Sequence, residues 1–383
     1  MSVTPSFSCV ICGDGILDEI DGFGVLTRVT SDSKPWPAGG RLAECRSCGA
    51  IQKFPDAKWL EEIGLIYSTF EVYHQSGGQE QAVFTEKGES MPRSARLVSF
   101  MRDCLALPDR GRLLDVGCGN GVTLRSFAEW FPGWSLNGTE WDDKTLPALR
   151  AIPGFERLYT CPVTDIPDVF DLVTLVHSLE HLVDPMRSLR DIHGKTGPAG
   201  HLFVEVVDCE QNPYDVLVAD HLLHFTGTVL DFACRRSGFS TIPHDGPVIR
   251  KELTLVGRKA DVPATLPPPA PLSGLARRHV AWLRDQAAYF QDRANHAPQY
   301  AIFGTSIGGT WLHGQLGSET AFFVDEDPSR IGRTHLGRPI MAPGDIPAGT
   351  EIFLPLPEAI AAGIARRLTR PGVAFRLPPA YAV

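Results

Sequence analysis

The segment LLDVGCGNGVTL, residues 113–124, constrains the fold of this 383-residue chain more than any other. An apolar run ends on Asp115, three alternating glycines follow (Gly117, Gly119 and Gly121), and a helical pattern comes next. Glycine lets the backbone adopt positive φ and approach another molecule closely. A strand, a glycine turn and a helix N-terminus together form a site for a nucleotide-like ligand. We therefore predict an α/β domain with a ligand site at this turn.

Apolar segments of strand length recur along the central part of the chain, with helical patterns between them. This alternation predicts a doubly wound parallel sheet over residues 112–257. An amphipathic helical pattern at 86–106 precedes the first strand. The expected strands are residues 112–117, 135–140, 155–160, 170–178 and 201–207.

The glycine turn favours S-adenosylmethionine (SAM) over a dinucleotide. Its pattern is G-x-G-x-G, whereas dinucleotide turns have G-x-G-x-x-G to hold a pyrophosphate, which SAM lacks. Glu140 ends the second strand, where a carboxylate can accept two hydrogen bonds from ribose hydroxyls. Asp165 follows the third strand, where an acid can accept from the adenine amino group. His177 ends the fourth strand and is assigned to the same site, with a histidine satisfied by packing as the alternative.

The glycine turn, the spaced acids and the segment HSLEHL after the fourth strand resemble the class I SAM-dependent methyltransferases over residues 85–257. The expected SAM-binding residues are Asp115, Gly117, Gly119, Gly121, Glu140, Asp165 and His177.

Four cysteines near the N-terminus form two pairs with metal-ligand spacing. Cys9 and Cys12 lie in CVIC, Cys45 and Cys48 lie in CRSC, and a glycine follows each pair. Two such turns can place four thiolates tetrahedrally around Zn²⁺. Buried cysteines or a redox pair are the alternatives. Because the chain is acidic and has one such module, we expect a structural zinc and not a nucleic-acid finger.

The composition limits the partners and the compartment. A net charge of −9 argues against binding along a nucleic-acid backbone, which needs a basic face. No apolar run reaches the length of a membrane span, and the N-terminus has no signal-peptide pattern. We therefore expect a cytoplasmic protein with a small-molecule substrate. The oligomeric state stays open, and a monomer is compatible with the sequence.

A second strand–glycine–helix unit lies near the C-terminus. The segment YAIFGTSIGGTWL contains Gly304, Gly308 and Gly309, and Asp325 ends the next strand, a pattern that resembles half a Rossmann unit. These glycines serve either a substrate nucleotide or packing. The expected organisation is a zinc-binding module with a substrate-lid segment (1–85), a SAM-dependent methyltransferase core (86–260), a Pro-rich linker (261–272) and a Rossmann-like substrate-binding domain (273–383).

Taken together, these parts resemble the sugar C-methyltransferases of deoxysugar biosynthesis, over nearly the whole chain. The similarity lies in CVIC…CRSC, FEVYHQSGGQEQ, DHLLHFT and FFVDEDPSRIGRTHLGRPIMAP. It implies methylation of a carbon next to the keto group of a nucleotide-linked 4-ketohexose.

Carbon methylation beside a ketone needs a base for the α-proton and a donor for the enolate oxygen. The resemblance implies His221 as the base with Asp220 orienting it, and histidine titrates in the suitable range. Tyr73 is expected to donate to the enolate, and His181 to line the same pocket. A packed core tyrosine and a helix-capping histidine are the respective alternatives. Further candidates are His224 and Glu180.

Two other functions stay open. The acceptor atom can be oxygen or nitrogen, on a sugar or another polar metabolite, since Asp220 stands where the family usually has glutamate. A zinc-ribbon interaction protein that binds SAM without catalysis is the third reading.

Overall fold

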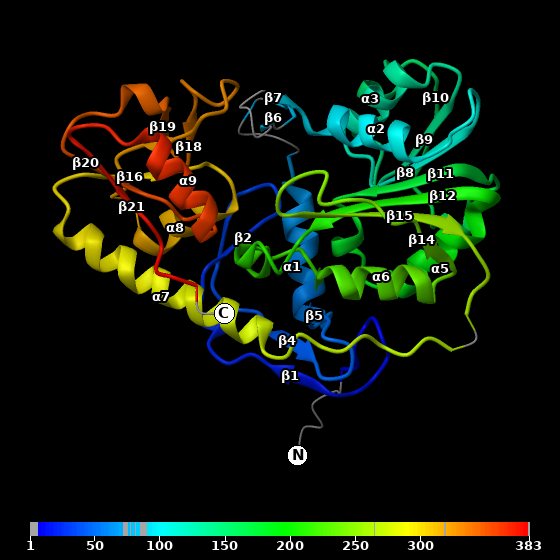
Figure 1. Cartoon of the computed structure of the whole chain (residues 1–383), viewed down its shortest axis with the longest axis horizontal. Helices are drawn as coiled ribbons and strands as arrows, with labels where there is room; N and C mark the ends of the chain where they lie inside the picture. The colour runs from blue at the N-terminus through cyan, green and yellow to red at the C-terminus, as the bar shows by residue number, and fades with distance from the viewer. Residues whose placement is uncertain are drawn as a thin grey trace.

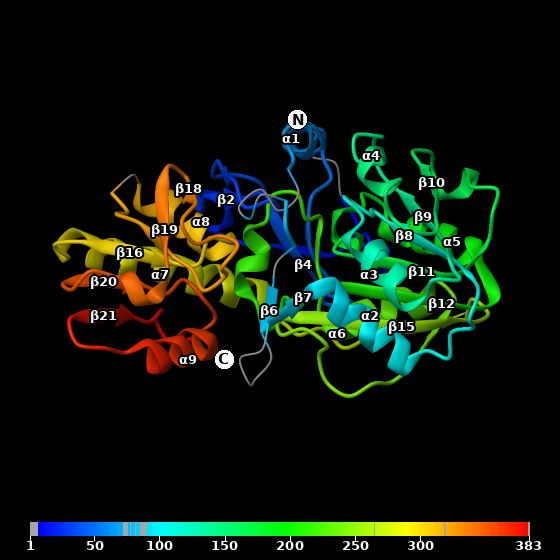
Figure 2. The ribbon, with the colours of Figure 1, turned by 90° about the horizontal axis from the view of Figure 1, so that it is seen from above.

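The computed structural model describes residues 7–71, 76, 78–80, 82–84, 90–263, 265–317 and 319–381. Two views show the core sheet on one side of the molecule and the C-terminal unit on the other, with N-terminal strands between them (Figures 1 and 2). None of the helices in these ranges combines the length and apolarity needed to cross a membrane.

The core is a seven-stranded sheet in the order β10-β9-β8-β11-β12-β15-β14. Five strands lie at the predicted positions and pair in parallel: β8 (Arg112–Val116), β9 (Ser135–Thr139), β10 (Phe155–Tyr159), β11 (Phe170–Val176) and β12 (Thr196–Val207). The expectation of a wholly parallel sheet is wrong at one edge. There β15 (Glu252–Lys259) is antiparallel to both β12 and β14 (Phe239–Thr241), because a short loop and not a crossover helix joins β14 to β15.

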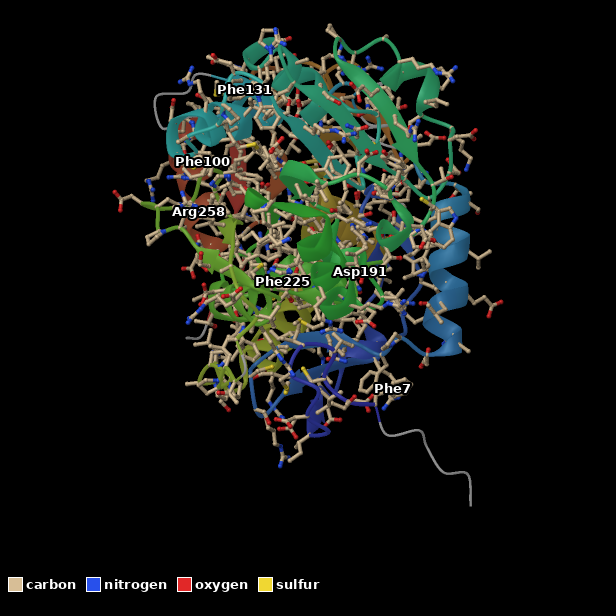
Figure 3. All side chains as sticks on the ribbon, turned by 90° about the vertical axis from the view of Figure 1, so that its right-hand side faces the viewer. Phe7, Phe100, Phe131, Asp191, Phe225 and Arg258 are labelled. Atoms are coloured by element: carbon tan, nitrogen blue, oxygen red, sulfur yellow. The ribbon has the colours of Figure 1, made fainter. Side chains whose placement is uncertain are left out.

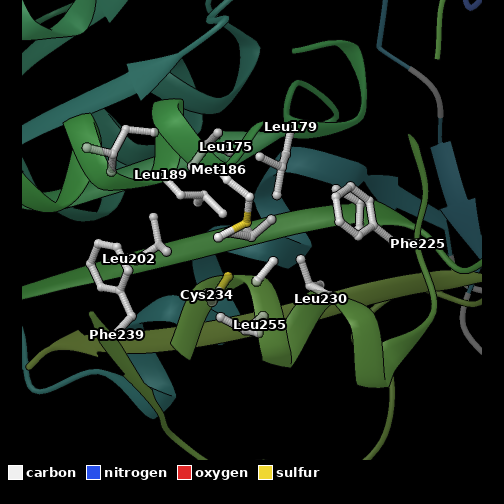
Figure 4. Close-up of a cluster of buried hydrophobic side chains, with 14 of the residues drawn as sticks. Leu175, Leu179, Met186, Leu189, Leu202, Phe225, Leu230, Cys234, Phe239 and Leu255 are labelled. Carbon is white, nitrogen blue, oxygen red and sulfur yellow. The ribbon is translucent and has the colours of Figure 1, made fainter. Parts of the chain in front are cut away.

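Helices cover both faces of this sheet, as a doubly wound fold requires. On one face, buried side chains of α5 (Pro185–Lys195) and α6 (Gly227–Arg236) pack on the strands, and Figure 4 shows Leu189 and Cys234 in this cluster. On the other face lie α2 (Arg93–Cys104) and α3 (Val122–Trp130). A one-turn helix, α4 (Leu146–Leu149), follows β9.

The N-terminal sheet has the order β1-β4-β5-β13. Three of its strands precede the core: β1 (Leu17–Glu19), β4 (Leu42–Cys45) and β5 (Ile51–Lys53). The fourth, β13 (Leu223–His224), comes from a long excursion after β12. Phe225, labelled in Figure 3, packs in one cluster with Cys48 of the N-terminal segment. The N-terminal sheet is thus completed by a strand of the core domain.

The remaining N-terminal elements are short apart from one helix. Helix α1 (Ala57–Ser68) begins at Asp56, whose side chain accepts from the backbone N–H of Trp59 at 2.9 Å. The others are η1 (Phe23–Val25) and the hairpins β2 (Arg28–Val29) with β3 (Pro35–Trp36) and β6 (Ala82–Phe84) with β7 (Ser90–Pro92).

The C-terminal unit is a six-stranded sheet in the order β18-β19-β17-β16-β20-β21, with all pairs parallel except β18 with β19. The predicted strand–glycine–helix unit is present as β16, Gly304 and α8. Its elements are α7 (Leu275–His296), β16 (Tyr300–Phe303), α8 (Ile307–Leu316), β17 (Phe323–Val324), β18 (Thr334–His335), β19 (Arg338–Met341), η6 (Pro343–Asp345), β20 (Thr350–Phe353), α9 (Glu358–Leu368) and β21 (Val373–Arg376).

Packing alone requires glycine at two positions of α8. A Cβ on Gly308 would lie 2.2 Å from the carbonyl oxygen of Pro355, and one on Gly309 would lie 2.0 Å from that of Gly304. Of the two readings of these glycines, the geometry therefore favours packing.

Candidate functional site

The glycine turn lies between β8 and α3, as the sequence predicts. Gly117, Gly119 and Gly121 have φ of 75°, 54° and 78°, a region that side chains other than glycine rarely adopt. A Cβ on Gly117 would also lie 2.8 Å from the Cβ of Ser178. The turn therefore touches the segment that follows β11, and both features exclude larger residues.

Glu140 reaches the glycine turn from the end of β9. Its Oε1 accepts from the backbone N–H of Gly119 at 2.6 Å, and its Oε2 accepts from that of Trp141 at 3.1 Å. Asp165 lies in η3 (Val163–Asp165), exposed, and accepts from its neighbour Thr164 at 3.2 Å. Asp165 is thus exposed and Glu140 partly exposed, and both acids follow strands at the carboxyl edge of the sheet.

Asp115 has an internal contact. Its carboxylate accepts from the hydroxyl of Thr174 on β11 at 2.7 Å, and only 2% of the residue is exposed. Burial raises its pKa to about 7, against the opposing effect of the Thr174 hydrogen bond. Asp115 thus joins β8 to β11 directly below the glycine turn.

The surroundings of the turn fit a polar ligand such as SAM. The side-chain oxygens of Asn120 in the turn and of Ser178 beside it are shielded from solvent, and neither has a hydrogen-bond partner among the described residues. Buried polar atoms are nearly always paired in native proteins. A ligand bound at the turn would supply partners for these two oxygens.

His177 uses both ring nitrogens within the protein. Nδ1 lies 3.3 Å from Oε1 of Glu180, and Nε2 lies 3.2 Å from Oε2 of Glu252, which also pairs with Arg93 at 2.6 Å. Burial alone would lower the pKa of His177, but the two carboxylates raise it to about 10. The geometry therefore favours the packing alternative over a contact of His177 with SAM.

Two imidazoles of the predicted catalytic set share one carboxylate. Nδ1 of His221 lies 2.9 Å from Oδ1 of Asp215, and Nδ1 of His224 lies 2.8 Å from Oδ2. Asp215 belongs to η5 (Pro213–Leu217) and is 2% exposed. Burial alone would raise the pKa of Asp215, but the two imidazoles hold it well below its usual value. An ionised carboxylate only accepts, so each Nδ1 donates to it.

The predicted role of Asp220 is wrong at this point, because its carboxylate does not hold His221. It accepts from the backbone N–H of Ser31 at 2.8 Å and from the Ser31 hydroxyl at 2.5 Å. Oδ2 of Asp220 also lies 3.4 Å from Nδ1 of His181. Asp220 therefore anchors the N-terminal loop and lies beside His181, while Asp215 takes the orienting position.

His181 comes from η4 (Leu179–His181), directly after the segment that touches the glycine turn. Its ring stands edge-on to that of His221, with 4.7 Å between the ring centroids. The hydroxyl of Tyr67, at the end of α1, lies 3.1 Å from Nδ1 of His181. Tyr73, the predicted enolate donor, lies outside the described residues.

The charges around Tyr67 connect the imidazole cluster to the SAM site. Burial raises the pKa of Tyr67, and the carboxylates of Asp220, Glu180 and Glu140 raise it further. Because Glu140 also holds the glycine turn, the Tyr67 hydroxyl lies within electrostatic reach of the predicted ribose acid. Tyr67 is therefore protonated at neutral pH and able to donate.

The surroundings shift the pKa values of the three imidazoles in different directions. Burial lowers the pKa of His224 to about 4, and burial also lowers that of His181. Burial acts in the same direction on His221, but the Asp215 carboxylate outweighs it and raises the pKa above the usual value. The hydrogen bonds of the described residues engage only Nδ1 of His221, so its Nε2 has no partner there, and the buried Nε2 of His224 has none either.

Sequence reasoning missed Asp215 and Tyr67. Asp215 lies six positions before His221 in an irregular segment, and Tyr67 lies near the end of a helix, so no local spacing links either residue to a histidine. Only the folding of the excursion after β12 against α1 brings them together.

The four N-terminal cysteines converge. Sγ atoms of Cys9 and Cys48 lie 3.6 Å apart, those of Cys12 and Cys45 lie 3.5 Å apart, and all four ligand atoms lie within 4.8 Å of one another. Tetrahedral zinc with Zn–S bonds of about 2.3 Å places sulfurs about 3.8 Å apart. The donor set and its spacing therefore fit zinc.

Residues 90–244 match a family model described as a methyltransferase domain. The ubiquinone biosynthesis O-methyltransferase of Aeromonas salmonicida (strain A449) is 29% identical over 122 residues, which cover 29% of this chain and 50% of that protein. The enzyme of the same name from Pseudomonas aeruginosa (strain LESB58) is 26% identical over 122 residues, covering 29% and 52%. The chain thus spans about half the length of the curated relatives it matches.

Among solved structures, the Burkholderia thailandensis 1,6-didemethyltoxoflavin-N1-methyltransferase with bound S-adenosylhomocysteine aligns with a TM-score of 0.39 and 17% identity. The alignment covers 55% of this chain and 96% of that one. The family match and the curated relatives confirm the expected SAM-dependent methyltransferase domain in the centre of the chain.

Proposed function

We propose that this protein transfers the methyl group of SAM to the carbon next to the keto group of a nucleotide-linked deoxysugar, through an enolate. The observation that carries the proposal is the ionised Asp215 beside His221, which leaves Nε2 of His221 unpartnered among the described residues. This arrangement produces a histidine base whose ring contacts that of His181, three residues after the Ser178 that touches the glycine turn.

SAM, held over the glycine turn, supplies an electrophilic methyl group. Gly117, Gly119 and Gly121 would allow the close backbone approach, and the Glu140 carboxylate would accept from the ribose hydroxyls. The oxygens of Asn120 and Ser178, unpaired among the described residues, would gain partners from the bound donor. These residues bind and orient the donor, and they do not move protons.

His221 removes the α-proton. In its neutral form His221 donates its Nδ1–H to Asp215, so its Nε2 carries the lone pair that accepts the proton. Asp215 then stabilises the imidazolium by a buried charge-assisted hydrogen bond. The second imidazole, His224, stays neutral because burial depresses its pKa, and it holds the other oxygen of Asp215 in place. Positioned base catalysis of this kind contributes about 10²–10⁴-fold.

The developing enolate oxygen needs a hydrogen-bond donor. The Tyr67 hydroxyl is protonated, lies next to His181 and belongs to the same cluster as the base. Tyr73, six positions further along the chain, stays a candidate for the same role. A donor already in position stabilises the charge as it forms, because the protein does not need to reorganise.

For the N-terminal module we propose one structural Zn²⁺ held by Cys9, Cys12, Cys45 and Cys48. The sulfur spacing supports it, and so do the turns at Gly13 and Gly49, which have φ of 86° and 74°. All four positions carry thiolate ligands, so no ligand position remains for a substrate, as in structural sites generally.

The deciding experiment uses thymidine diphosphate 4-keto-6-deoxyglucose as the probe. With SAM present, mass spectrometry should detect a methylated nucleotide sugar. Without SAM, in deuterated water, NMR should show exchange of the α-proton. Absence of both methylation and exchange would refute the C-methylation proposal for this substrate class.

A second candidate is methyl transfer to a hydroxyl oxygen, which the O-methyltransferase names of the curated relatives favour. Methylation of a hydroxyl oxygen uses the base to remove the hydroxyl proton, but it does not require exchange of a proton on carbon. Methyl transfer to a hydroxyl without any deuterium incorporation at carbon would establish this candidate instead.

A further inference from the structure

Lys53 is a buried cation outside the set of residues assigned above. It ends β5 of the N-terminal sheet, and only 1% of the residue is exposed. Its ammonium donates to the backbone carbonyls of Val218 and His221, the latter at 3.0 Å. No carboxylate lies within salt-bridge distance of it in the described part of the chain.

Burying an ammonium group costs free energy unless hydrogen bonds replace its hydration. Burial accordingly lowers the pKa of Lys53 to about 7, while the negative charges of Asp215 and Asp220 act in the opposite direction. An apolar side chain of similar length would fill the space without this cost. Unlike an apolar side chain, Lys53 holds two backbone carbonyls, one at each end of the same turn.

That turn carries the base. It runs from Val218 to His221, and the backbone N–H of Lys53 also donates to the carbonyl of Leu222 at 2.8 Å. From the other side, the indole N–H of Trp59 donates to the carbonyl of Ala219 at 3.1 Å. The backbone of this turn is therefore held from the N-terminal segment by Lys53 and Trp59, and from the core domain by Nδ1 of His181, which lies 3.2 Å from the carbonyl oxygen of Asp220.

The same strand connects the turn to the cysteine module. β5 pairs with β13, with His224 opposite Ile51 and Leu223 opposite Gln52. The hairpin of β4 and β5 contains Cys45 and Cys48, and the side chain of Gln52 accepts from the backbone N–H of Val10 at 2.9 Å. A continuous set of hydrogen bonds thus runs from both cysteine pairs to the two imidazoles.

We propose that Lys53 is a positioning residue for proton transfer: it fixes the turn of residues 218–221, so that the ring of His221 stays on Asp215, and it links the cysteine module to the base. The inference rests on the proposed function, in which His221 is the base. In physical terms, Lys53 restrains the orientation of the His221 ring.

Lys53→Met tests it, since methionine keeps the length of the side chain and removes the donors. We expect kcat with thymidine diphosphate 4-keto-6-deoxyglucose to fall between about ten- and a hundredfold, the usual effect of a small misplacement of a reacting group. KM and the SAM dissociation constant should change less than about twofold, because Lys53 is not among the residues assigned to the SAM site. Lys58→Met, an exposed lysine five positions along the chain, is the matched control and should leave all three values unchanged.

NMR of the histidine rings separates this inference from the function itself. The spectra are recorded at a pH above the raised pKa of His221, where its ring is neutral. In the unmutated protein, two-bond ¹H–¹⁵N spectra should then show His221 with its proton on Nδ1; in Lys53→Met they should show a mixture of tautomers. In Lys53→Gln, which keeps one donor group, the fraction of the Nδ1–H tautomer should lie between those of the unmutated protein and Lys53→Met. This variant provides the test if the methionine variant does not fold. A fixed Nδ1–H tautomer in these variants, or an unchanged kcat, would overturn the inference. Failure of the unmutated protein to methylate the sugar would refute the proposed function alone, and the tautomer measurement would still decide the role of Lys53.

Discussion

Nδ1 of His221 donates to Oδ1 of Asp215 over 2.9 Å, and this contact leaves Nε2 as the ring nitrogen available for the proposed proton transfer. The orienting acid comes from six residues earlier in the chain, while the acid adjacent in sequence is engaged by Ser31. The proposed chemistry therefore depends on a tertiary contact that the local motif does not contain.

Asp215→Asn should lower turnover by about 10²–10⁴-fold, because asparagine does not stabilise an imidazolium and its amide favours the other tautomer of one of the two rings. SAM affinity, measured by calorimetry, should be unchanged. Asp245→Asn, an exposed acid on a loop, is the control and should retain full turnover. Equal rates for both variants would remove Asp215 from the mechanism.

His221→Asn should stop deuterium exchange of the substrate's α-proton in the absence of SAM, and it should lower methyl transfer at least about a hundredfold. Proton exchange monitored by NMR isolates the base from the methyl-transfer step. His296→Asn, on the exposed end of α7, should exchange normally. If the His221 variant exchanges at the unmutated rate, the base is another residue, with His181 the next candidate.

Glu140→Ala should weaken SAM binding by about 1.5–3 kcal/mol, the usual range for hydrogen bonds to a charged group. The loss has two sources: the ribose contacts and the hydrogen bond that holds the Gly119 N–H. Calorimetric titration with SAM provides the measurement, and Glu129→Ala, exposed on α3, provides the control. Unchanged affinity in the Glu140 variant would contradict the predicted ribose contact.

Metal analysis of protein purified without chelators should give one zinc per chain. Cys45→Ser should lower the zinc content and the midpoint of thermal unfolding, because the free energy of metal binding is part of the folding free energy. Cys104→Ser, a partly buried thiol remote from the module in sequence, should keep the zinc. Protein with no zinc and the same thermal midpoint would rule out the metal site.

Stability should depend on His177 above neutral pH. Its pKa is about 10 in the folded protein and about 6.5 in an unfolded chain, so the folded state binds the extra proton between these values. The contribution of His177 is therefore complete below about pH 6.5 and is lost as the pH rises to about 10. Urea unfolding from pH 6 to 10 should show a steeper loss of stability in the unmutated protein than in His177→Gln. Parallel pH profiles would mean that His177 is not charged in the folded state.

The local parts of the structure followed from the sequence. The strand, the glycine turn and the helix at residues 112–130 are present as predicted, since the apolar run and the glycines act within a few residues of one another. The four cysteines could be paired by their spacing and turn glycines alone. The antiparallel pairing of β15 with β12 and β14 was not predicted, because the direction of β15 depends on the path of the loop that joins it to β14.

For the candidate site, the sequence determined which residue types are available and where strands end, so it placed Glu140 and the glycines correctly at one turn. Only the tertiary structure decided that Asp215 and not Asp220 holds His221, and that His177 is occupied by Glu180 and Glu252. Backbone propensities act between near neighbours, whereas hydrogen bonds between side chains form wherever the packed chain brings donors and acceptors together. The strands, turns and helices of this protein therefore follow largely from residues that are close in the sequence. The hydrogen-bond partners of its histidines follow from the tertiary structure.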